Sequence, residues 1–121
     1  MTSIRRLFVY GTLMPGHEAW PIIEPDAERA THTTVAGLLF DTGAGYPAAV
    51  FGADGARITG SAITFHAARA SAALERLDRY EGPEYRRIVV DDGHGPLYAY
   101  EWIAPRDRLI VIPSGSWSAA S

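Results

Sequence analysis

One helical segment stands among short β-rich stretches, and this contrast limits the folds open to the chain. Residues from Ala67 to Glu81 are rich in Ala, Leu, Glu and Arg, which favour helices. Gly82-Pro83 follows and predicts the helix end, because Gly adopts the left-handed cap and Pro cannot continue a helix. One helix among several short strands predicts the α+β class.

The remaining segments alternate between apolar runs and turn residues. We expect strands at Leu7–Tyr10, Thr33–Asp41, Pro47–Phe51, Arg57–Phe65, Tyr85–Asp91 and Leu97–Ala104, and a last apolar run at Leu109–Ile112. Pro21 and Pro25 predict short broken helical turns over His17–Ala30. Gly37 indicates a bulge or a close backbone approach, and Asp54-Gly55 a hairpin between its two flanking strands. Together these features predict a small mixed β-barrel or curved sheet with one main helix and short flanking helices.

Composition excludes several classes of function. The chain has 121 residues, which fits a single domain over 1–121. It contains no Cys, so disulfides, thiol nucleophiles and Cys-based metal sites are excluded. All 11 basic residues are Arg, which excludes a P-loop or Schiff-base lysine. A net charge of -3 argues against nucleic-acid and membrane-surface partners.

Two further patterns concern location and metals. No apolar run reaches the length of a transmembrane helix and no signal peptide is evident, so we expect a soluble, cytoplasmic protein. The four His residues lack metal-ligand spacing, so we expect no metal site.

Glu81 occupies an unusual place on the predicted helix. Ala70, Ala73, Leu74, Leu77 and Glu81 share one stripe at helical spacing. A carboxylate pointing where the leucines point is desolvated, and it lies near the negative end of the helix dipole. Both effects raise its pKa toward the range of a general base. The alternative is a frayed helix end in which Glu81 pairs with Arg79 or Arg86 in water.

The segment Val9-Tyr10-Gly11-Thr12-Leu13 ends the first predicted strand in a sharp turn. Such a turn can aim successive backbone N–H groups at one point and bind an anion, for which a carboxylate is the natural guest. The alternative is a plain strand-to-loop turn in which Gly11 only supplies an unusual backbone dihedral.

Four motifs in order resemble the γ-glutamylcyclotransferase-like family. Val9 to Gly16 is similar to its first signature, and Leu77-Asp78-Arg79-Tyr80-Glu81-Gly82 to its second. Tyr85-x-Arg87-x-x-Val90 and Ser114-Gly115-x-Trp117 also match, and Gly60–Phe65 is similar to the strand before the helix. The resemblance implies a compact mixed barrel in which the turn binds the α-carboxylate of a γ-glutamyl group and Glu81 is the catalytic acid/base.

The resemblance also implies a reaction and a set of binding residues. The α-amine of the substrate attacks its own γ-carbonyl and releases 5-oxoproline and an amine, without metal or cofactor. The implied substrate-binding residues are Tyr10, Gly11, Thr12, Leu13, Tyr85, Tyr100 and Trp117. Family members often carry Tyr where this chain has Trp102, which leaves open whether Tyr100 or Trp102 faces the pocket.

Three matters stay open at this stage. The leaving amine would contact loops such as Asp41–Pro47 and the C-terminal tail, and the oxyanion donor could be a backbone N–H or a Tyr hydroxyl. The chain could be a monomer or a homodimer. The rival functions are an amidase-type acyl transfer that uses the same Glu and a non-catalytic module that binds an amino-acid carboxylate.

Overall fold

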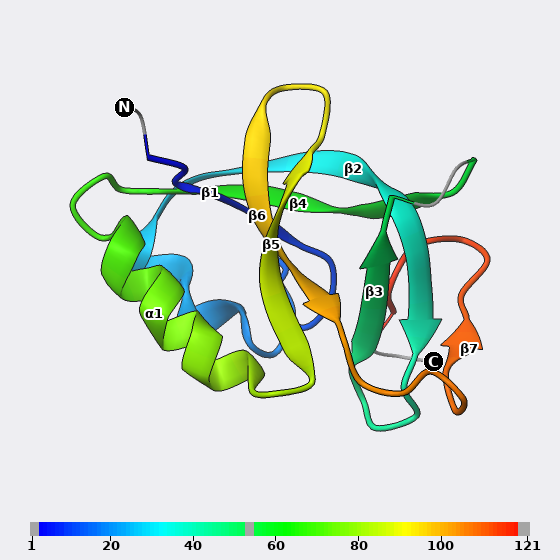
Figure 1. Cartoon of the computed structure of the whole chain (residues 1–121). Coiled ribbons are helices and arrows are strands. Elements are labelled where there is room, and N and C mark those ends of the chain that lie inside the picture. Colours follow the sequence, from blue (N-terminus) through cyan, green and yellow to red (C-terminus); the bar gives the residue numbers. More distant parts are fainter. Residues whose placement is uncertain (1–2, 53–54, 119–121) are drawn as a thin grey trace.

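The computed structural model describes residues 3–52 and 55–118 and has a mixed sheet with one main helix (Figure 1). The strands are β1 (Arg6–Val9), β2 (Ala27–Asp41), β3 (Pro47–Phe51), β4 (Arg57–Phe65), β5 (Tyr85–Asp91), β6 (Pro96–Trp102) and β7 (Ile110–Val111). The helix α1 spans Ala70–Glu81, and the short 3-10 turns η1 and η2 span Trp20–Ile22 and Glu24–Asp26. The sheet order is β3-β2-β4-β1-β6-β5, with β7 added beside β2. The α+β prediction is confirmed.

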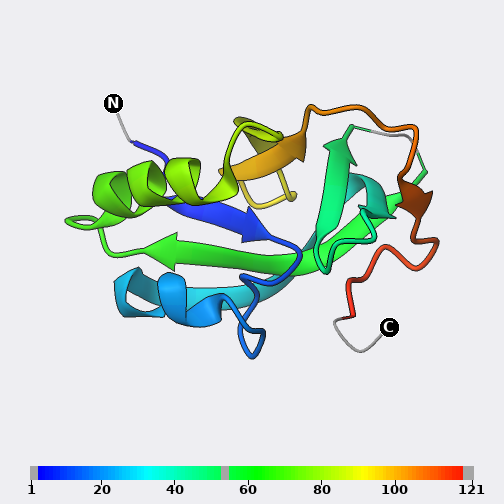
Figure 2. The ribbon, with the colours of Figure 1, turned by 90° about the horizontal axis from the view of Figure 1, so that it is seen from below.

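The pairing of β1 makes the sheet mixed, and contacts between β3 and β6 nearly close it. β1 runs antiparallel to β4 and parallel to β6. The backbone N–H of Phe51 donates to the Glu101 carboxylate at 3.0 Å, which fastens the end of β3 to β6. In Figures 1 and 2, α1 lies toward one end of the molecule and β3 and β7 toward the other. The expected small curved barrel is therefore confirmed.

The long strand β2 changes its partner at Gly37. Its residues 27–36 pair with β4, whereas Gly37–Asp41 pair with β3. A Cβ on Gly37 would lie 2.7 Å from the carbonyl oxygen of Val50, so the expected close backbone approach is confirmed.

The prediction that β3 and β4 pair as a hairpin is wrong. Among the described residues, both strands pair with β2 and share no ladder with each other. The hairpin turn lies instead between β2 and β3, where the N–H of Gly43 donates to Asp41 at 2.8 Å. Asp54 itself lies outside the described residues.

Several predicted boundaries differ from those of the structure. The helix begins at Ala70 instead of Ala67, because residues 66–69 form a turn in which Arg69 N–H donates to the His66 carbonyl at 2.9 Å. The helical turns end at Asp26, and β2 starts earlier than expected because residues 27–36 find partners on β4. β6 runs from Pro96 to Trp102 in place of 97–104, and only Ile110–Val111 of the last apolar run pairs, with β2.

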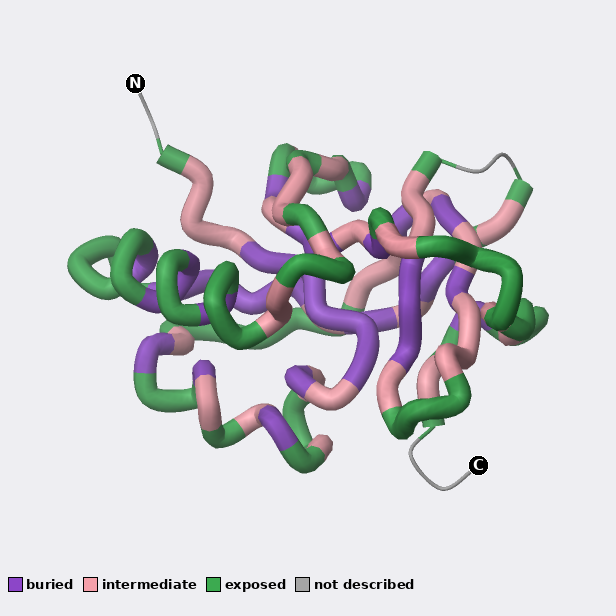
Figure 3. Tube along the Cα trace, turned by 60° about the horizontal axis from the view of Figure 1, so that its bottom comes forward, coloured by how far each residue is buried: buried purple, intermediate pink, exposed green. Residues whose placement is uncertain are grey.

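The apolar side chains form two clusters, one on each face of β1. Leu7 and Val9 pack with the buried stripe of α1, which confirms the predicted helix face. Phe8 and Tyr10 point to the other cluster, inside the barrel. Burial on both faces explains why the β1 sequence is a continuous apolar run. Figure 3 shows the buried segments running through the middle of the molecule, with the outer side of α1 exposed.

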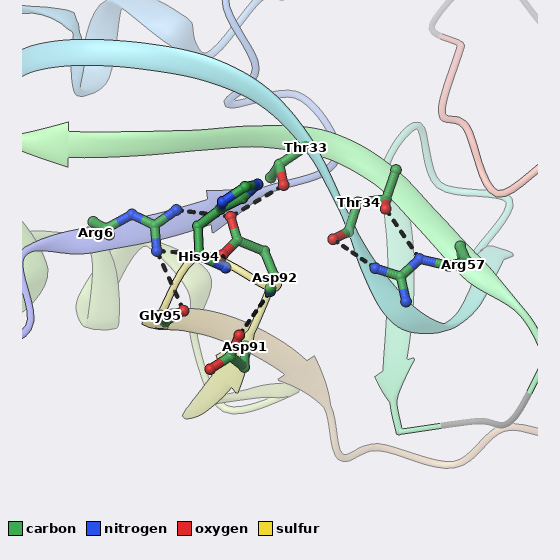
Figure 4. Close-up of polar contacts among 9 residues, drawn as sticks. Arg6, Thr33, Thr34, Arg57, Asp91, Asp92, His94 and Gly95 are labelled. Atoms are coloured by element: carbon green, nitrogen blue, oxygen red, sulfur yellow. Dashed lines mark hydrogen bonds and ion pairs between the residues drawn. The ribbon is translucent and has the colours of Figure 1, made fainter.

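Asp92 fastens the β5–β6 loop to the body of the sheet. Its side chain is 1% exposed and accepts hydrogen bonds from Arg6 at 2.7 Å and from Thr33 at 3.0 Å (Figure 4). The N–H of His94 donates to its other oxygen at 3.0 Å. Burial alone would raise the pKa of Asp92, but the hydrogen bonds from Arg6, His94 and Thr33 outweigh it and lower the pKa below its usual value.

None of the helices in residues 3–52 and 55–118 is long and apolar enough to cross a membrane; α1 has 12 residues.

Candidate active site

A cavity of about 460 Å³ lies where the chain leaves β1. Four parts of the fold line it: the end of β1 with the turn after it, the loop between β2 and β3, the end of α1 with the start of β5, and Tyr100 of β6. Among the lining residues are six of the seven predicted binding residues and the predicted catalytic one: Tyr10, Gly11, Thr12, Leu13, Tyr85, Tyr100 and Glu81. Segments far apart in sequence therefore meet at this cavity.

The turn after β1 offers three adjacent backbone N–H groups. Two bonds fix its shape: Met14 N–H donates to the Gly11 carbonyl at 3.1 Å, and Ala19 N–H donates to the Thr12 carbonyl at 2.8 Å. The N–H groups of Gly11, Thr12 and Leu13 have no acceptor among the described residues. Successive unpaired N–H groups in a cavity wall can bind a carboxylate.

Glycine is required at position 11 because a side chain would not fit there, and not because of its dihedral angle. Gly11 does not have a positive φ, so the unusual dihedral that the plain-turn alternative assigned to it is wrong. A Cβ at this position would lie 2.7 Å from Cγ of Pro47. The close contact between the turn and the loop before β3 therefore depends on a residue without a side chain.

Glu81 is the last residue of α1 and lies partly buried in the cavity wall. Burial raises the pKa of its carboxyl from 4.5 to about 7. Within the described part of the chain, Glu81 forms no ion pair, so the alternative pairing with Arg79 or Arg86 is wrong. Gly82 follows with φ of 76°, a positive value that favours glycine, and the helix ends at this carboxylate. A carboxyl that titrates near neutrality can both accept and return a proton.

Three tyrosines of the cavity wall donate their hydroxyl protons to the protein. Tyr10 donates to the carbonyl of Tyr100 at 2.6 Å, and Tyr85 donates to the carbonyl of Pro47 at 2.7 Å. Tyr100 donates to the Asp78 carboxylate at 2.6 Å. Desolvation, the largest effect, raises the pKa of all three, so they stay protonated. Their rings shape the wall while their protons are already engaged.

Tyr100, and not Trp102, faces the cavity. Both residues lie on the same face of β6, but Trp102 packs edge-on against Tyr85 with ring centroids 5.2 Å apart. Its indole N–H donates to the carbonyl of Pro105 at 3.2 Å. Trp102 therefore supports the wall from behind.

Trp117 is the one predicted binding residue that does not line the cavity. It packs against the core cluster inside the barrel, beside residues such as Phe8 and Leu39. The preceding Gly115 fits tightly against the backbone of Arg57, and the Thr59 N–H donates to the Gly115 carbonyl at 2.8 Å. The C-terminal motif thus holds the chain end against β4.

The predicted binding and catalytic residues did not include four lining residues whose side chains carry a carboxylate or a hydroxyl: Glu18, Tyr46, Tyr80 and Glu84. Tyr46 lies within the loop Asp41–Pro47, which was expected to contact the leaving amine, so the sequence indicated this loop but not the individual residue. Glu18 and Glu84 lie in turns, where no periodicity indicates which way a side chain points.

The lining carries negative but no positive side chains. Glu18, Glu81 and Glu84 belong to it, whereas no Arg or His does. Within the described residues, no three His, Asp or Glu side chains are grouped as metal ligands would be.

The structure is thus a small barrel in which unpaired backbone N–H groups and a partly buried carboxyl group line one cavity. The chain matches the family model described as gamma-glutamyl cyclotransferase, AIG2-like, over residues 7–119. The chain belongs to this family. No curated protein matches it.

Solved structures share the fold. An uncharacterized protein from Pyrococcus horikoshii is 23% identical, with a TM-score of 0.72 over 94% of this chain and 89% of that one. Protein ytfP from Escherichia coli is 28% identical, with a TM-score of 0.62 over 93% of this chain and 95% of that one. The uropathogenic E. coli-specific protein c4763 is 17% identical, with a TM-score of 0.74 over 96% and 94%.

Proposed function

We propose that the protein is a γ-glutamyl cyclotransferase that converts a γ-glutamyl amide into 5-oxoproline and a free amine. One observation carries the proposal: Glu81 lines the same cavity as the three unpaired N–H groups of Gly11, Thr12 and Leu13. A γ-glutamyl group has an α-carboxylate that suits the N–H groups and an α-ammonium group that suits a carboxylate base. Membership of the gamma-glutamyl cyclotransferase family supports the same reaction.

The first step is removal of a proton from the substrate's ammonium group. An α-amino group has a reference pKa of about 8, so at neutral pH it is mostly protonated and cannot attack. Glu81, with a pKa of about 7, accepts the proton. The turn holds the α-carboxylate meanwhile, so that amine and γ-carbonyl approach within one molecule.

In the second step the amine nitrogen bonds to the γ-carbonyl carbon and closes a five-membered ring. The bond between this carbon and the leaving nitrogen then breaks, and Glu81 returns a proton to that nitrogen. Overall, two protons leave the α-nitrogen and two reach the leaving nitrogen, so charge is conserved and no water is consumed.

The test is release of 5-oxoproline from a panel of γ-glutamyl amides, measured by mass spectrometry. Glu81→Gln keeps the shape of the side chain and removes the base, so the rate should fall by about 100-fold or more. Glu75→Gln is the matched control, because Glu75 is exposed on the same helix and does not line the cavity.

Each rival function has its own outcome. Full activity in Glu81→Gln would contradict the role of Glu81. Free glutamate in place of 5-oxoproline would indicate an amidase-type reaction. Tight binding of γ-glutamyl compounds without turnover, unchanged by Glu81→Gln, would indicate a binding module.

A further inference from the structure

A groove of about 660 Å³ lies beside the β5–β6 loop and shares no lining residue with the cavity lined by Glu81. Side chains from β1, β2 and β4 line it, together with the residues before β1 and the β5–β6 loop. Its lining is basic, with three Arg and two His against one acid, whereas the whole chain has a net charge of -3. We call it the arginine groove, and its basic residues are Arg5, Arg6, Arg29, His32 and His94.

Three residues of the arginine groove form a row across adjacent strands. Thr64 of β4 is the register partner both of Arg6 on β1 and of Arg29 on β2. Residues directly opposite each other in antiparallel strands project to the same face of the sheet, with Cβ atoms about 5 Å apart. All three line the groove. One hydroxyl therefore stands between two side chains that end in guanidinium groups.

The hydroxyl of Thr64 has no partner within the described part of the chain. Thr64 is only 7% exposed, yet its hydroxyl takes part in no hydrogen bond with a described residue. The hydroxyl is not sealed inside the protein, because the one sealed side-chain polar atom without a partner in residues 3–52 and 55–118 is Nε1 of Trp117. It therefore opens on the groove. Buried polar side chains usually have a hydrogen-bond partner, so this hydroxyl suits an acceptor supplied from the groove.

Arg29 carries the uncompensated positive charge of the row. It is exposed and forms no hydrogen bond or ion pair with another described residue. Arg5 is less free, because it donates to the carbonyl of Phe65 at 3.1 Å and lies 3.9 Å from the Glu28 carboxylate, which does not line the groove. An anion in the groove would thus find its strongest free attraction at Arg29.

Asp92 is the one acid of the lining, and its charge is already engaged. Its side chain is 1% exposed and accepts hydrogen bonds from Arg6 at 2.7 Å and from Thr33 at 3.0 Å (Figure 4). Arg6 also donates to the carbonyl of Gly95 at 3.3 Å. Asp92 therefore fixes Arg6 in place and leaves the positive charge of Arg29 unbalanced.

We propose that the arginine groove binds the phosphate group of a small molecule, either inorganic phosphate or a phosphate monoester, between Arg29 and the hydroxyl of Thr64. A guanidinium group can donate two parallel hydrogen bonds to two oxygens of one phosphate, and the hydroxyl can donate to a third oxygen. The apolar side chains of Ile4, Ala62 and Pro96 complete the lining, and the volume leaves room for a group attached to the phosphate.

The experiment follows the backbone amide resonances of isotope-labelled protein by NMR as inorganic phosphate, phenyl phosphate or benzoate is added. Both phosphates should shift the amides of Arg29 and Thr64 in a saturable way, and benzoate should bind more weakly. Tighter binding of phenyl phosphate would identify a monoester as the preferred form, and tighter binding of inorganic phosphate the free ion. Benzoate binding as tight as that of phenyl phosphate would overturn the proposal, as would phosphate shifts confined to the Gly11–Leu13 turn.

Two variants test the row directly. Arg29→Gln and Thr64→Val should each raise the Kd for the tighter-binding phosphate at least about tenfold, because each loses a hydrogen bond to a charged group. Thr64→Val keeps the shape of the side chain, and its free energy of unfolding should not fall, since the hydroxyl has no protein partner to lose. Urea unfolding measures this second effect.

Arg106→Gln is the matched control for Arg29→Gln. Arg106 is exposed and lies outside the groove lining, so its loss should change the Kd by less than about twofold. An equal rise of the Kd in Arg106→Gln and Arg29→Gln would indicate a net-charge effect and overturn the proposal, as would an unchanged Kd in Arg29→Gln or Thr64→Val. Release of 5-oxoproline does not enter this test, so either proposal can fail while the other stands.

Discussion

The hydroxyl of Tyr100 donates to Oδ1 of Asp78 at 2.6 Å, one helical turn before Glu81. Asp78 also accepts from Nε of Arg87 at 3.2 Å. The phenol proton of Tyr100 is therefore directed at α1 and engaged by Asp78. Tyr10 and Tyr85 likewise donate to backbone carbonyls, so the hydroxyl protons of these three tyrosines are already engaged and are not free for a developing oxyanion.

Removing a tyrosine hydroxyl should therefore affect stability more than catalysis. We expect Tyr100→Phe and Tyr85→Phe to keep the turnover rate within about threefold of the wild type, since losing an oxyanion donor costs about 100-fold or more. Each should lower the free energy of unfolding by about 1 kcal/mol, because a hydrogen bond is lost. Steady-state kinetics and urea unfolding measure the two effects. Turnover slowed by about two orders of magnitude in a variant with an unchanged fold would mean that the hydroxyl reaches the substrate.

The pH dependence of the reaction should follow the ionisation of Glu81. Burial raises the pKa of this carboxyl to about 7, and only the ionised form accepts a proton. We expect kcat/KM to rise about tenfold per pH unit below pH 7 and to level off above it. The measurement is kcat/KM from pH 5 to pH 8, a range chosen around this pKa. A profile already flat at pH 5 would contradict a general base with this pKa.

Glu81 should also make the fold less stable at high pH. Its pKa is higher in the folded state, about 7, than the ordinary 4.5, so the folded protein holds this proton more tightly. Its contribution to stability is fully present below pH 4.5 and is lost as the pH rises through 7. As the pH rises between these values, the free energy of unfolding of Glu81→Gln should therefore increase by up to about 3 kcal/mol relative to that of the wild type. Thermal unfolding at several pH values tests this, and a pH-independent difference would refute it.

The helix and the strands could be predicted from sequence because their residues repeat with a period. The buried stripe of α1 directed Glu81 toward the core, and the apolar run of β1 placed the Tyr10–Leu13 turn at a strand end. The partner of β3 could not be predicted, since adjacency along the chain favoured β4. The pairing of β3 depends on Gly37, because β2 pairs with β4 before this residue and with β3 from this residue on.

That Glu18 and Glu84 line the cavity could not be predicted for a different reason. Glu18 and Glu84 lie in turns, and only the folded loops bring them to one opening. Trp117 belongs to a motif that predicted it to bind substrate, but its side chain packs in the barrel core. Local sequence does not say which side of the barrel this segment covers.

Gly11 offers a test of the turn that separates the site from stability. A Cβ there would lie 2.7 Å from Cγ of Pro47, so Gly11→Ala should push the turn and the loop before β3 apart. We expect KM to rise at least about tenfold, because displacement of the N–H groups weakens the hold on the carboxylate. Gly16→Ala is the control: its φ of 85° makes Ala strained, but the site is open. It should lose about 1 kcal/mol of stability and keep its KM. Equal effects of both variants on KM would contradict the proposed role of the turn.

Asp92 should stabilise the fold at neutral pH and lose this effect in acid. Its carboxylate is held by Arg6, Thr33 and the N–H of His94, and its pKa is lowered below the usual 3.8. A lowered pKa adds stability above pH 3.8 that disappears as the pH falls through the folded-state pKa. We expect Asp92→Asn to lower the free energy of unfolding by about 2 kcal/mol at pH 7 and to match the wild type in strong acid. Urea unfolding at several pH values measures this difference.

The control for Asp92 is its exposed neighbour Asp91, which accepts one bond from the Gly93 N–H. Asp91→Asn should therefore have a smaller effect on the free energy of unfolding. The Asp92 contacts join β1, β2 and the β5–β6 loop and lie outside the cavity lining. At temperatures where Asp92→Asn is still folded, its turnover should therefore equal that of the wild type. Loss of activity in a fully folded Asp92→Asn protein would show that this loop affects the cavity.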